Sequence, residues 1–209
     1  MSGLHVWRIP YSTNVERVAL ALAWKGLSAT WVNVDPADRS AVVALSGQDL
    51  VPVLQTGDGH VITDSTAIVA WLEAQVPSPA LFPTDPARRA ETEFAIEWFN
   101  RVWKVPPNAI DAELAEPAPD AGRIAALSAQ LRGWLPWFEA LLADRPFLLG
   151  DELGAFDLCA FPFLKYGTLP VAADDPDSFH VVLADHLALG GAFPRLAAWI
   201  ARVDGLPRA

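Results

Sequence analysis

The chain has 209 residues, of which 52% are hydrophobic and 19% charged, and 25 acidic against 15 basic residues give a formal net charge of −10. This charge argues against a general nucleic-acid-binding protein, because affinity for phosphate backbones comes mainly from clustered cations. The apolar content is that of a globular chain rather than a disordered one. The length allows one large domain or two small ones.

Cysteine and histidine usage excludes two further kinds of site. The single cysteine, Cys159, cannot form an intramolecular disulfide or a thiolate metal cage, and its apolar neighbours indicate a small hydrophobic residue rather than a nucleophile. The four histidines are scattered, which predicts no metal site. Residues 1–5 lack the start of a secretory signal, and no apolar stretch approaches the ~20 residues of a membrane span. We therefore expect a cytoplasmic protein without a membrane partner.

The first part of the chain alternates short apolar runs with amphipathic stretches. Residues 4–9 predict a strand that Pro10 ends. Apolar residues at helical spacing between Val15 and Leu22 then predict a helix, and Gly26 suits the left-handed residue just beyond a helix end. This part therefore begins with a strand followed by a helix.

Further strands are predicted on either side of a short crossover from residue 35, followed by a hairpin and a helix that begins near residue 64. The order β-α-β-α-β-β-α predicts a small mixed sheet covered by helices. We expect both helical crossovers to join parallel strands and the hairpin to add an antiparallel pair. The predicted strands after the first are residues 30–34, 53–56 and 60–62.

Four prolines between residues 77 and 86 are too many for a helix or a central strand, so they predict a linker. We place the first domain at residues 1–77, the linker at 78–86 and the second domain at 87–209. Beyond the linker the strand signal disappears, and the second domain is predicted to be all-helical.

The second domain is predicted to open with one long helix. Apolar residues recur on one of its faces at Phe94, Trp98 and Val102, with Phe99 and Trp103 beside them. Pro106-Pro107 ends or kinks this helix. Pro136 is expected to bend a second long helix. The later helical patterns cover residues 124–142, 156–166, 181–189 and 193–203.

Three motifs in the first domain carry hydroxyl, amide or acidic side chains. Residues 11–14 fill the turn before the first helix, which opens with the pattern Ser-x-x-x-x-Arg-Val from Ser12 to Val18. Val51-Pro52 precedes the third strand, and Asp64-Ser65 opens the third helix. Ser, Thr and Asn are ordinary helix N-caps, so we expect one residue of the first motif to do only that. Together with the linker and the helical second half, the three motifs resemble the cytosolic glutathione transferases over essentially the whole chain.

The resemblance implies an α/β thioredoxin-like N-terminal domain and an all-α C-terminal domain. It implies an enzyme that activates the thiol of glutathione, or of a related thiol cofactor, for addition to a hydrophobic electrophile. Ser12 would activate the thiol, with Thr13 beside it as a fallback. Tyr11 would take this role only in a tyrosine-type arrangement.

The resemblance also assigns residues to the binding of the thiol peptide. Val51 would offer main-chain hydrogen bonds to its cysteinyl part, with Pro52 in the cis form. Asp64 and Ser65 would hold the γ-glutamyl end, since a helix N-terminus and a hydroxyl suit a carboxylate and an acidic side chain suits an ammonium. Arg39 falls near the place of a basic residue that meets the glycyl carboxylate.

Two segments depart from the pattern of the family. Leu50 stands where Lys or Gln is common, with Gln48 as the nearest polar substitute, so we expect weaker or altered thiol specificity. Residues 149–157 resemble the family's helix-capping segment, with Gly154 in place of the usual Ser or Thr and with the usual Asp at Asp157. That motif supports the fold rather than the chemistry.

For the electrophile we expect a pocket between Tyr11 and the long helix of the second domain. Phe99 and Trp103, one helical turn apart, are the preferred lining residues, although packing in the core is the more common role of such aromatic residues. Asn100 and Lys104 are the candidate polar contacts.

The resemblance implies a homodimer with a detoxifying role. Two alternatives remain open at this point. A thiol-dependent isomerase or reductase would use the same thiol site with another acceptor. A non-catalytic ligand-binding or interaction protein would keep the fold alone; Ser12, Asp64 and Ser65 argue against it, whereas Leu50 argues for it.

Overall fold

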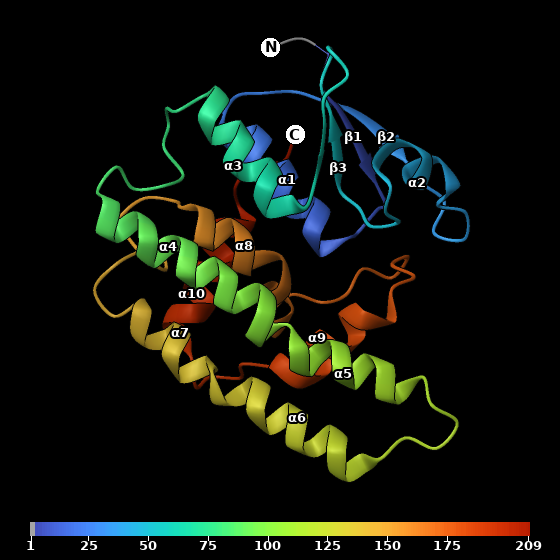
Figure 1. Ribbon diagram of the computed structural model, residues 1–209. Coiled ribbons are helices and arrows are strands. Elements are labelled where there is room, and N and C mark those ends of the chain that lie inside the picture. Colours follow the sequence, from blue (N-terminus) through green and yellow to red (C-terminus); the bar gives the residue numbers. More distant parts are fainter. Residues whose placement is uncertain (1–2) are drawn as a thin grey trace. The chain divides into compact units, whose positions relative to one another are not determined.

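The structure is a computed structural model that describes residues 3–209 (Figure 1). Residues 1 and 2, which belong to the predicted first domain, lie outside the described residues. The chain divides into two compact units. Unit 1 holds the residues up to Leu81 together with Leu206–Ala209, and unit 2 holds Phe82–Gly205. The division falls inside the predicted linker, residues 78–86.

The last four residues belong to unit 1, whereas the sequence pattern places them in the second, helical domain. Two contacts with the first helix explain this. The backbone N–H of Ala209 donates to the carbonyl of Ala19 at 3.2 Å, and the Arg208 guanidinium pairs with the Glu16 carboxylate at 2.9 Å.

Unit 1 is built on a four-stranded sheet in the order β2-β1-β3-β4 (Figure 1). Strands β1 and β2 are parallel, whereas β3 is antiparallel to both β1 and β4. The prediction of parallel crossovers is therefore right for the first crossover and wrong for the second, because the chain turns back after α2 and enters β3 in the opposite direction. The elements are β1 (His5–Arg8), β2 (Thr30–Asn33), α2 (Ser40–Ser46), β3 (Val53–Gln55) and β4 (Val61–Thr63).

Two helices, α1 (Thr13–Trp24) and α3 (Ser65–Gln75), pack against each other in unit 1 (Figure 1). The apolar stripe predicted for α1 is buried, and Val18 and Leu22 have no exposed surface. Gly26 has a φ of +64°, which confirms the left-handed residue expected beyond this helix.

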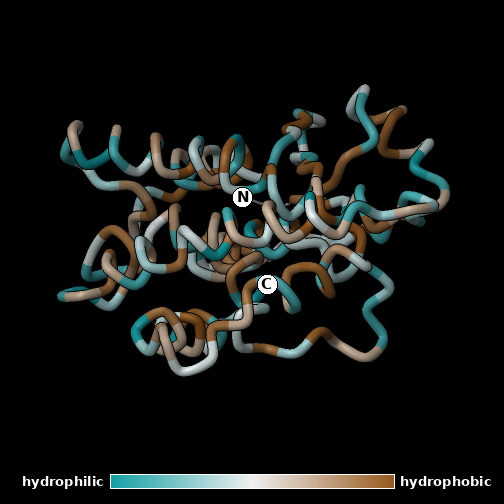
Figure 2. Tube along the Cα trace, turned by 90° about the horizontal axis from the view of Figure 1, so that it is seen from below, coloured by the Kyte–Doolittle hydropathy of each residue, from teal (hydrophilic) through white to brown (hydrophobic). Residues whose placement is uncertain are grey.

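Unit 2 is helical. Along the trace of the whole chain, hydrophobic and hydrophilic stretches are interspersed (Figure 2). A π-helical turn, η1, and a 3₁₀ turn, η2, interrupt its α-helices. The elements are α4 (Pro86–Trp98), η1 (Phe99–Trp103), α5 (Val105–Leu114), α6 (Ala121–Gly133), α7 (Leu135–Leu141), α8 (Ala155–Leu164), η2 (Lys165–Gly167), α9 (Ser178–Leu187) and α10 (Pro194–Asp204).

The predicted long helix after the linker is broken at η1, and its inward face differs from the predicted one. Phe94 is 73% exposed and Val102 41%, whereas Ile96 and Phe99 are buried. Phe94 precedes the π-helical turn, and the buried residues of α4 are Thr92, Ala95 and Ile96, so the inward face lies beside the predicted stripe. The π-helical turn then changes the angular spacing from Phe99 onward, and Val102 is left outside. Pro106 and its neighbour lie in the first turn of α5, where a missing N–H costs little.

Helix α8 runs through the core of unit 2, and all of its residues are buried. Its Asp157 is also buried and accepts three N–H groups: Leu148 N at 2.9 Å, Gly154 N at 2.9 Å and Trp199 Nε1 at 2.7 Å. The bond to Gly154 confirms the capping role predicted for this segment. Burial raises the pKa of Asp157 to about 6 despite these donors.

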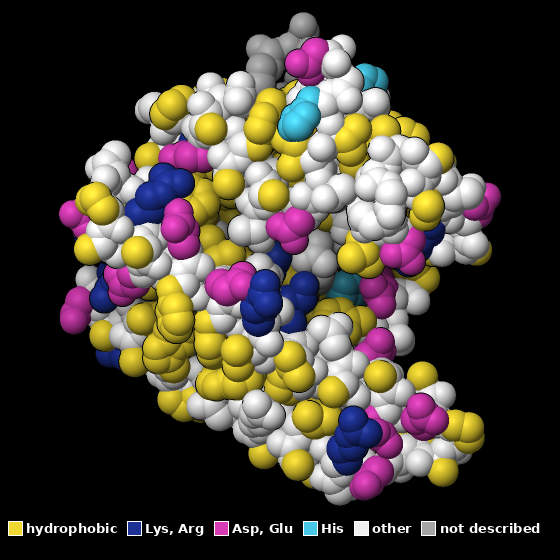
Figure 3. Space-filling model, viewed as in Figure 1, with side chains coloured by type: hydrophobic (Ala, Val, Ile, Leu, Met, Phe, Trp, Pro, Cys, Tyr) yellow, Lys and Arg dark blue, Asp and Glu magenta, His cyan; other side chains and the backbone are white. Residues whose placement is uncertain are grey.

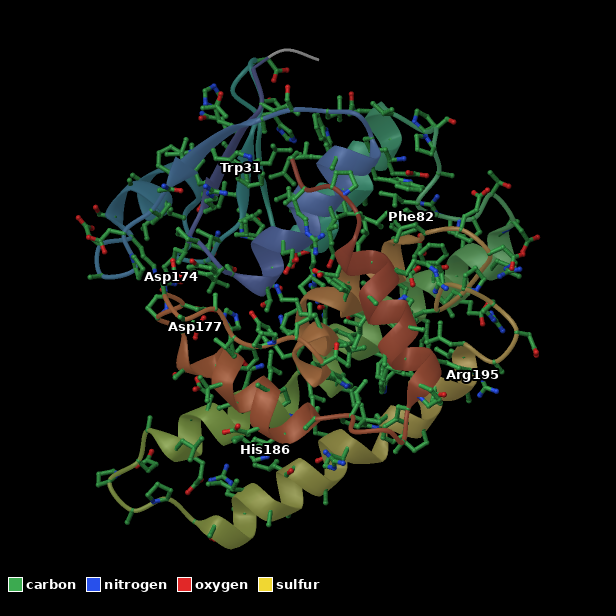
Figure 4. All side chains as sticks on the ribbon, turned by 180° about the vertical axis from the view of Figure 1, so that it is seen from behind. Trp31, Phe82, Asp174, Asp177, His186 and Arg195 are labelled. Atoms are coloured by element: carbon green, nitrogen blue, oxygen red, sulfur yellow. The ribbon has the colours of Figure 1, made fainter. Side chains whose placement is uncertain are left out.

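Side-chain hydrogen bonds fix α9 to the helices beside it. His186 Nδ1 lies 2.9 Å from the Ser128 hydroxyl of α6 (Figure 4), and the Ser178 hydroxyl donates to Asp111 of α5 at 3.1 Å. These contacts complete the packing of unit 2. Among residues 3–209, no helix is long and apolar enough to cross a membrane.

Candidate functional site

One end of the sheet of unit 1 gathers three of the predicted motifs. The register pairs Trp7 of β1 with Val53 of β3, and Val53 with Thr63 of β4. Ser12 follows β1 a few residues after Trp7. Pro52 directly precedes Val53, and Asp64 directly follows Thr63. Strand pairing therefore brings the three motifs to the same end of one sheet, although they are far apart in the sequence.

Ser12 occupies the N-cap position of α1, but its side chain makes no capping hydrogen bond. Its carbonyl accepts from Glu16 N at 3.0 Å, which begins the helix. The expectation that a residue of this turn acts as a side-chain cap is wrong for the N-cap residue, because the Ser12 hydroxyl is not engaged by the backbone. A half-buried hydroxyl at a helix N-terminus can donate to an anionic ligand.

The residues on either side of Ser12 differ in exposure. Thr13 is 5% exposed and lies inside unit 1, which disfavours its predicted role as the fallback donor to a ligand. Tyr11 is 40% exposed and has a φ of +67°. A bulky residue seldom adopts this left-handed conformation, so the turn holds Tyr11 in a constrained position directly before Ser12.

The peptide bond between Val51 and Pro52 is cis, which confirms the sequence prediction. Pro52 is buried and Val51 half-buried, so this bend belongs to the frame of the sheet. It places the Val51 main chain at the end of the sheet that also carries Ser12.

Asp64 and Ser65 form the start of α3. The Asp64 carboxylate caps the helix by accepting from Thr66 N at 2.8 Å and from Ala67 N at 3.0 Å. Asp64 has a φ of +72°, and its side chain stays at the surface. Ser65 is 3% exposed, and its hydroxyl accepts from Arg17 Nη1 at 3.2 Å.

Sequence reasoning noted Arg17 only as part of a motif and assigned it no role. Arg17 follows the turn residues on α1 and is 2% exposed. A signal for such a role was available in the sequence, because Arg17 stands directly before Val18 in the apolar stripe of α1. A charged residue there is either paired or functional.

The segment before β3 uses its polar side chains internally. The Gln48 amide donates to the Leu50 carbonyl at 2.9 Å and accepts from Leu50 N at 2.6 Å. Its predicted role as a substitute contact for the thiol peptide is therefore not supported, because both ends of the amide hold the loop. The side chain of Leu50 is 64% exposed.

Arg39 is also tied to this segment. It precedes α2, and its guanidinium donates to the carbonyl of Asp49 at 3.1 Å and to that of Pro36 at 3.3 Å. A guanidinium carries five N–H donors, so these two bonds leave capacity for a carboxylate. Arg39 remains a candidate for the glycyl end.

The aromatic residues predicted to line the electrophile pocket lie in the core of unit 2. Phe99 and Trp103 have no exposed surface and stack on each other with ring centroids 4.3 Å apart. Phe99 meets Phe156 and Phe163 edge-on at 6.3 and 5.5 Å. The prediction that these two residues line an open pocket is wrong, because their rings are enclosed by aromatic rings of the same unit.

The two polar candidates of that segment have partners in unit 2. Asn100 Oδ1 lies 3.9 Å from the Cys159 sulfur. The Lys104 ammonium lies 4.9 Å from the centre of the Phe163 ring, in cation–π geometry. Both residues stay candidate contacts for an acceptor substrate.

A separate surface pocket lies at the other end of the sheet, around the β3–β4 turn and the second half of α3. It is distinct from the candidate site, since His5, Gln55 and Val61 define that end by register. No group of three or more metal-ligating side chains occurs among the described residues. The pocket is lined by Leu4, Thr56, Gly57, Asp58, His60, Trp71 and Gln75.

Comparisons with known proteins match both parts of the chain to one family. Residues 7–80 match the family model described as glutathione S-transferase, N-terminal domain, and residues 69–207 match glutathione S-transferase, C-terminal domain. Glutathione S-transferase GstB of Escherichia coli K12 is 29% identical over 169 residues, 76% of this chain and 80% of the relative.

The chain is also similar to an isomerase and to a solved structure of a glutathione transferase. Maleylacetoacetate isomerase of Pseudomonas aeruginosa is 40% identical over 85 residues, which are 38% of this chain and only 40% of that relative. The theta class glutathione S-transferase of Xanthomonas axonopodis pv. citri, solved with glutathione bound, shares the fold with a TM-score of 0.73 and 28% identity, covering 97% of this chain and 92% of that one.

Proposed function

Because this chain belongs to the glutathione S-transferase family, we propose that it binds glutathione at the Ser12 end of the unit 1 sheet and activates the thiol for addition to a hydrophobic electrophile. One observation carries the proposal. The Ser12 hydroxyl is not used as a helix cap, and it lies at the same end of the sheet as cis-Pro52 and the start of α3.

The start of α3 suits the γ-glutamyl end of glutathione, which is an amino-acid zwitterion. The Asp64 carboxylate is at the surface and favours an ammonium. The N–H and the hydroxyl of Ser65, at the positive N-terminus of α3, favour a carboxylate. The ammonium of the ligand thus meets the charge of Asp64, and its carboxylate meets the hydrogen-bond donors of Ser65.

Thiol activation requires that the sulfur anion be stabilised. An unperturbed thiol has a pKa near ~8.5, so lowering it by about two units takes roughly 2.7 kcal/mol. A hydroxyl hydrogen bond to a charged sulfur contributes ~1.5–3 kcal/mol, and the N-terminus of α1 adds ~0.3–1 kcal/mol. Ser12 acts as a hydrogen-bond donor in this account, not as a base.

A second candidate function is that of a glutathione-dependent isomerase. The similarity to a maleylacetoacetate isomerase falls on 85 residues at 40% identity, a higher identity than the match to GstB. A glutathione-dependent cis-trans isomerase would use the same thiol site, add the thiolate to a maleyl-type acid and release it after bond rotation.

We also propose that the protein is a cytoplasmic homodimer that detoxifies electrophiles. Hydrophobic side chains gather on the face over α4 and α7 (Figure 3). Phe94 and Trp137 are 73% and 40% exposed, and Trp137 contacts the Trp98 ring with centroids 4.9 Å apart. An apolar face of this kind suits a second copy of the chain.

The test is calorimetric titration with glutathione, followed by assays with an aryl halide and with a maleyl-type cis acid. Conjugation of the halide supports the transferase, and isomerisation of the acid without net use of glutathione supports the isomerase. If glutathione binds but neither substrate reacts, the protein is a binding member of the family. Absence of glutathione binding would overturn the proposal.

A further inference from the structure

The structure ties a buried cation on α1 to the residue that opens α3. Arg17 is 2% exposed and Ser65 is 3% exposed, and Arg17 Nη1 donates to the Ser65 hydroxyl at 3.2 Å. The two residues are 48 positions apart in the sequence. A guanidinium is costly to bury, so its placement beneath this helix start calls for a physical reason.

The hydrogen bond from Arg17 determines what the Ser65 hydroxyl can do. A hydroxyl has one hydrogen to donate and can accept from others. Because Ser65 already accepts from Arg17, its hydrogen is available for an acceptor on another side, and a cationic donor makes that hydrogen a stronger donor. The acceptor that benefits most is an anion.

The cap of α3 leaves room for the same anion. The Asp64 carboxylate accepts from Thr66 N and Ala67 N, but not from Ser65 N. Ser65 therefore lies outside the cap and can present both its N–H and its O–H to one carboxylate. Arg17 supports this pair from the buried side.

We propose that Arg17 is a positioning residue for glutathione that acts through Ser65 on the α-carboxylate of the γ-glutamyl group. This inference rests on the proposed function and deepens it. Arg17 is too buried to be a general surface contact, so its effect passes through the orientation of the Ser65 hydroxyl and through its positive charge. Arg17 thereby contributes to the choice of γ-glutamyl thiols over thiols that lack the carboxylate.

A purely structural role predicts a different outcome. If Arg17 only joined α1 to α3, its replacement would weaken the binding of every ligand at the site alike. If it acts on the carboxylate, only ligands that carry this group lose affinity. The distinguishing ligand is the glutathione analogue with 4-aminobutanoyl in place of γ-glutamyl, which keeps the amine and lacks the α-carboxylate.

The experiment measures dissociation constants for glutathione and this analogue by calorimetry, in the full chain and in Arg17→Gln, Arg17→Lys and Ser65→Ala. We expect Arg17→Gln to weaken glutathione about tenfold and to leave the analogue unchanged within about twofold. Arg17→Lys should restore part of the loss because it keeps the charge. Ser65→Ala with Arg17→Gln should be little worse than Ser65→Ala alone, because the two act as a unit.

Lys25→Gln is the matched control. Lys25, the residue directly after α1, is also a buried cation and also bonds to a side chain of α3, Glu73, but at the other end of the helix pair. This variant should destabilise unit 1 and yet keep the ratio of the two dissociation constants. If Arg17→Gln does not fold, the Arg17→Lys and Ser65→Ala ratios decide.

The outcomes that would overturn the inference differ in what they reject. Equal losses for the two ligands would show a structural role, and unchanged glutathione affinity in both Arg17 variants would show no role. Failure of the unaltered protein to bind glutathione would reject the proposed function and this inference with it. Normal glutathione binding with an unchanged ratio would reject the inference alone.

Discussion

Lys25 at the end of α1 and Glu73 on α3 form an ion pair that is almost closed to solvent, with side-chain exposures of 0% and 12%. The Lys25 ammonium also donates to the Pro79 carbonyl, and the Glu73 carboxylate accepts from Leu81 N at 3.0 Å. The pair thus holds the segment around Pro79 and Leu81, at the end of unit 1, against both helices.

Removing one partner of this pair should lower stability strongly. Glu73→Gln leaves the Lys25 ammonium buried without its counter-charge, and we expect the free energy of unfolding to fall by about 3–5 kcal/mol. Urea denaturation measures the change. Arg89→Ala, which breaks an exposed pair with Glu93 (47% and 55% exposed), is the control and should cost less than about 1 kcal/mol. Equal effects of the two variants would show that burial does not matter here.

Ser12→Ala should separate binding from chemistry. Loss of the hydroxyl should leave glutathione affinity nearly unchanged, reduce kcat/KM at neutral pH by ~10- to 100-fold, and move the midpoint of the pH–rate profile upward. Ser28→Ala, an exposed serine beyond the other end of α1, is the matched control. Wild-type activity of Ser12→Ala at pH 6.5, together with loss of activity in Tyr11→Phe, would assign the thiol to Tyr11 instead.

Arg39→Ala tests the glycyl end of the thiol peptide. If the guanidinium meets the glycyl carboxylate, the variant should bind glutathione about tenfold more weakly and γ-glutamylcysteine, which lacks glycine, with unchanged affinity. Calorimetry with both peptides measures this. A comparable loss for both would mean that Arg39 only holds the loop through the carbonyls of Pro36 and Asp49.

Asp157 should make stability depend on pH in a known direction. Burial raises its pKa from 3.8 to about 6, so between these values the folded chain binds more protons than the unfolded chain. The contribution of Asp157 to the free energy of unfolding therefore falls as pH rises from about 4 to about 6, by up to about 3 kcal/mol. Lowering the pH across this range restores that contribution.

The measurement is the difference in unfolding free energy between the unaltered protein and Asp157→Asn at several pH values. As pH rises, the free energy of unfolding of the unaltered protein should fall relative to that of Asp157→Asn, since the amide does not titrate. Asp151→Asn, an exposed change in the same segment, should show no such trend. A difference that is constant from pH 4 to pH 7 would refute the assignment to Asp157.

Phe94→Glu tests the proposed homodimer. A charge on the most exposed large hydrophobic residue of α4 should shift light scattering at micromolar concentration from dimer to monomer. Leu114→Glu, at the end of α5 and 49% exposed, is the control for added charge alone. A monomer in the unaltered protein would remove the basis of the proposal.

The sequence alone determined those features that depend on neighbouring residues. The helical stripe and the glycine of α1, the turn before β4 and the N-cap Asp64 follow from local conformational preference and short-range hydrogen bonds. The same holds for the capping contact from Asp157 to Gly154, only three residues apart. The cis form of Pro52 was reached from the family resemblance rather than from local preference.

Only the tertiary structure decided which residues meet across the chain. The direction of β3, the enclosure of Phe99 and Trp103 with Phe94 left outside, and the bond from Arg17 to Ser65 depend on elements far apart in the sequence. Apolar periodicity indicates that a helix has an inward face, but the packing partners select which of two neighbouring apolar stripes is buried. Burial of Arg17 beside the start of α3 depends in the same way on how the two helices pack, which no local pattern encodes.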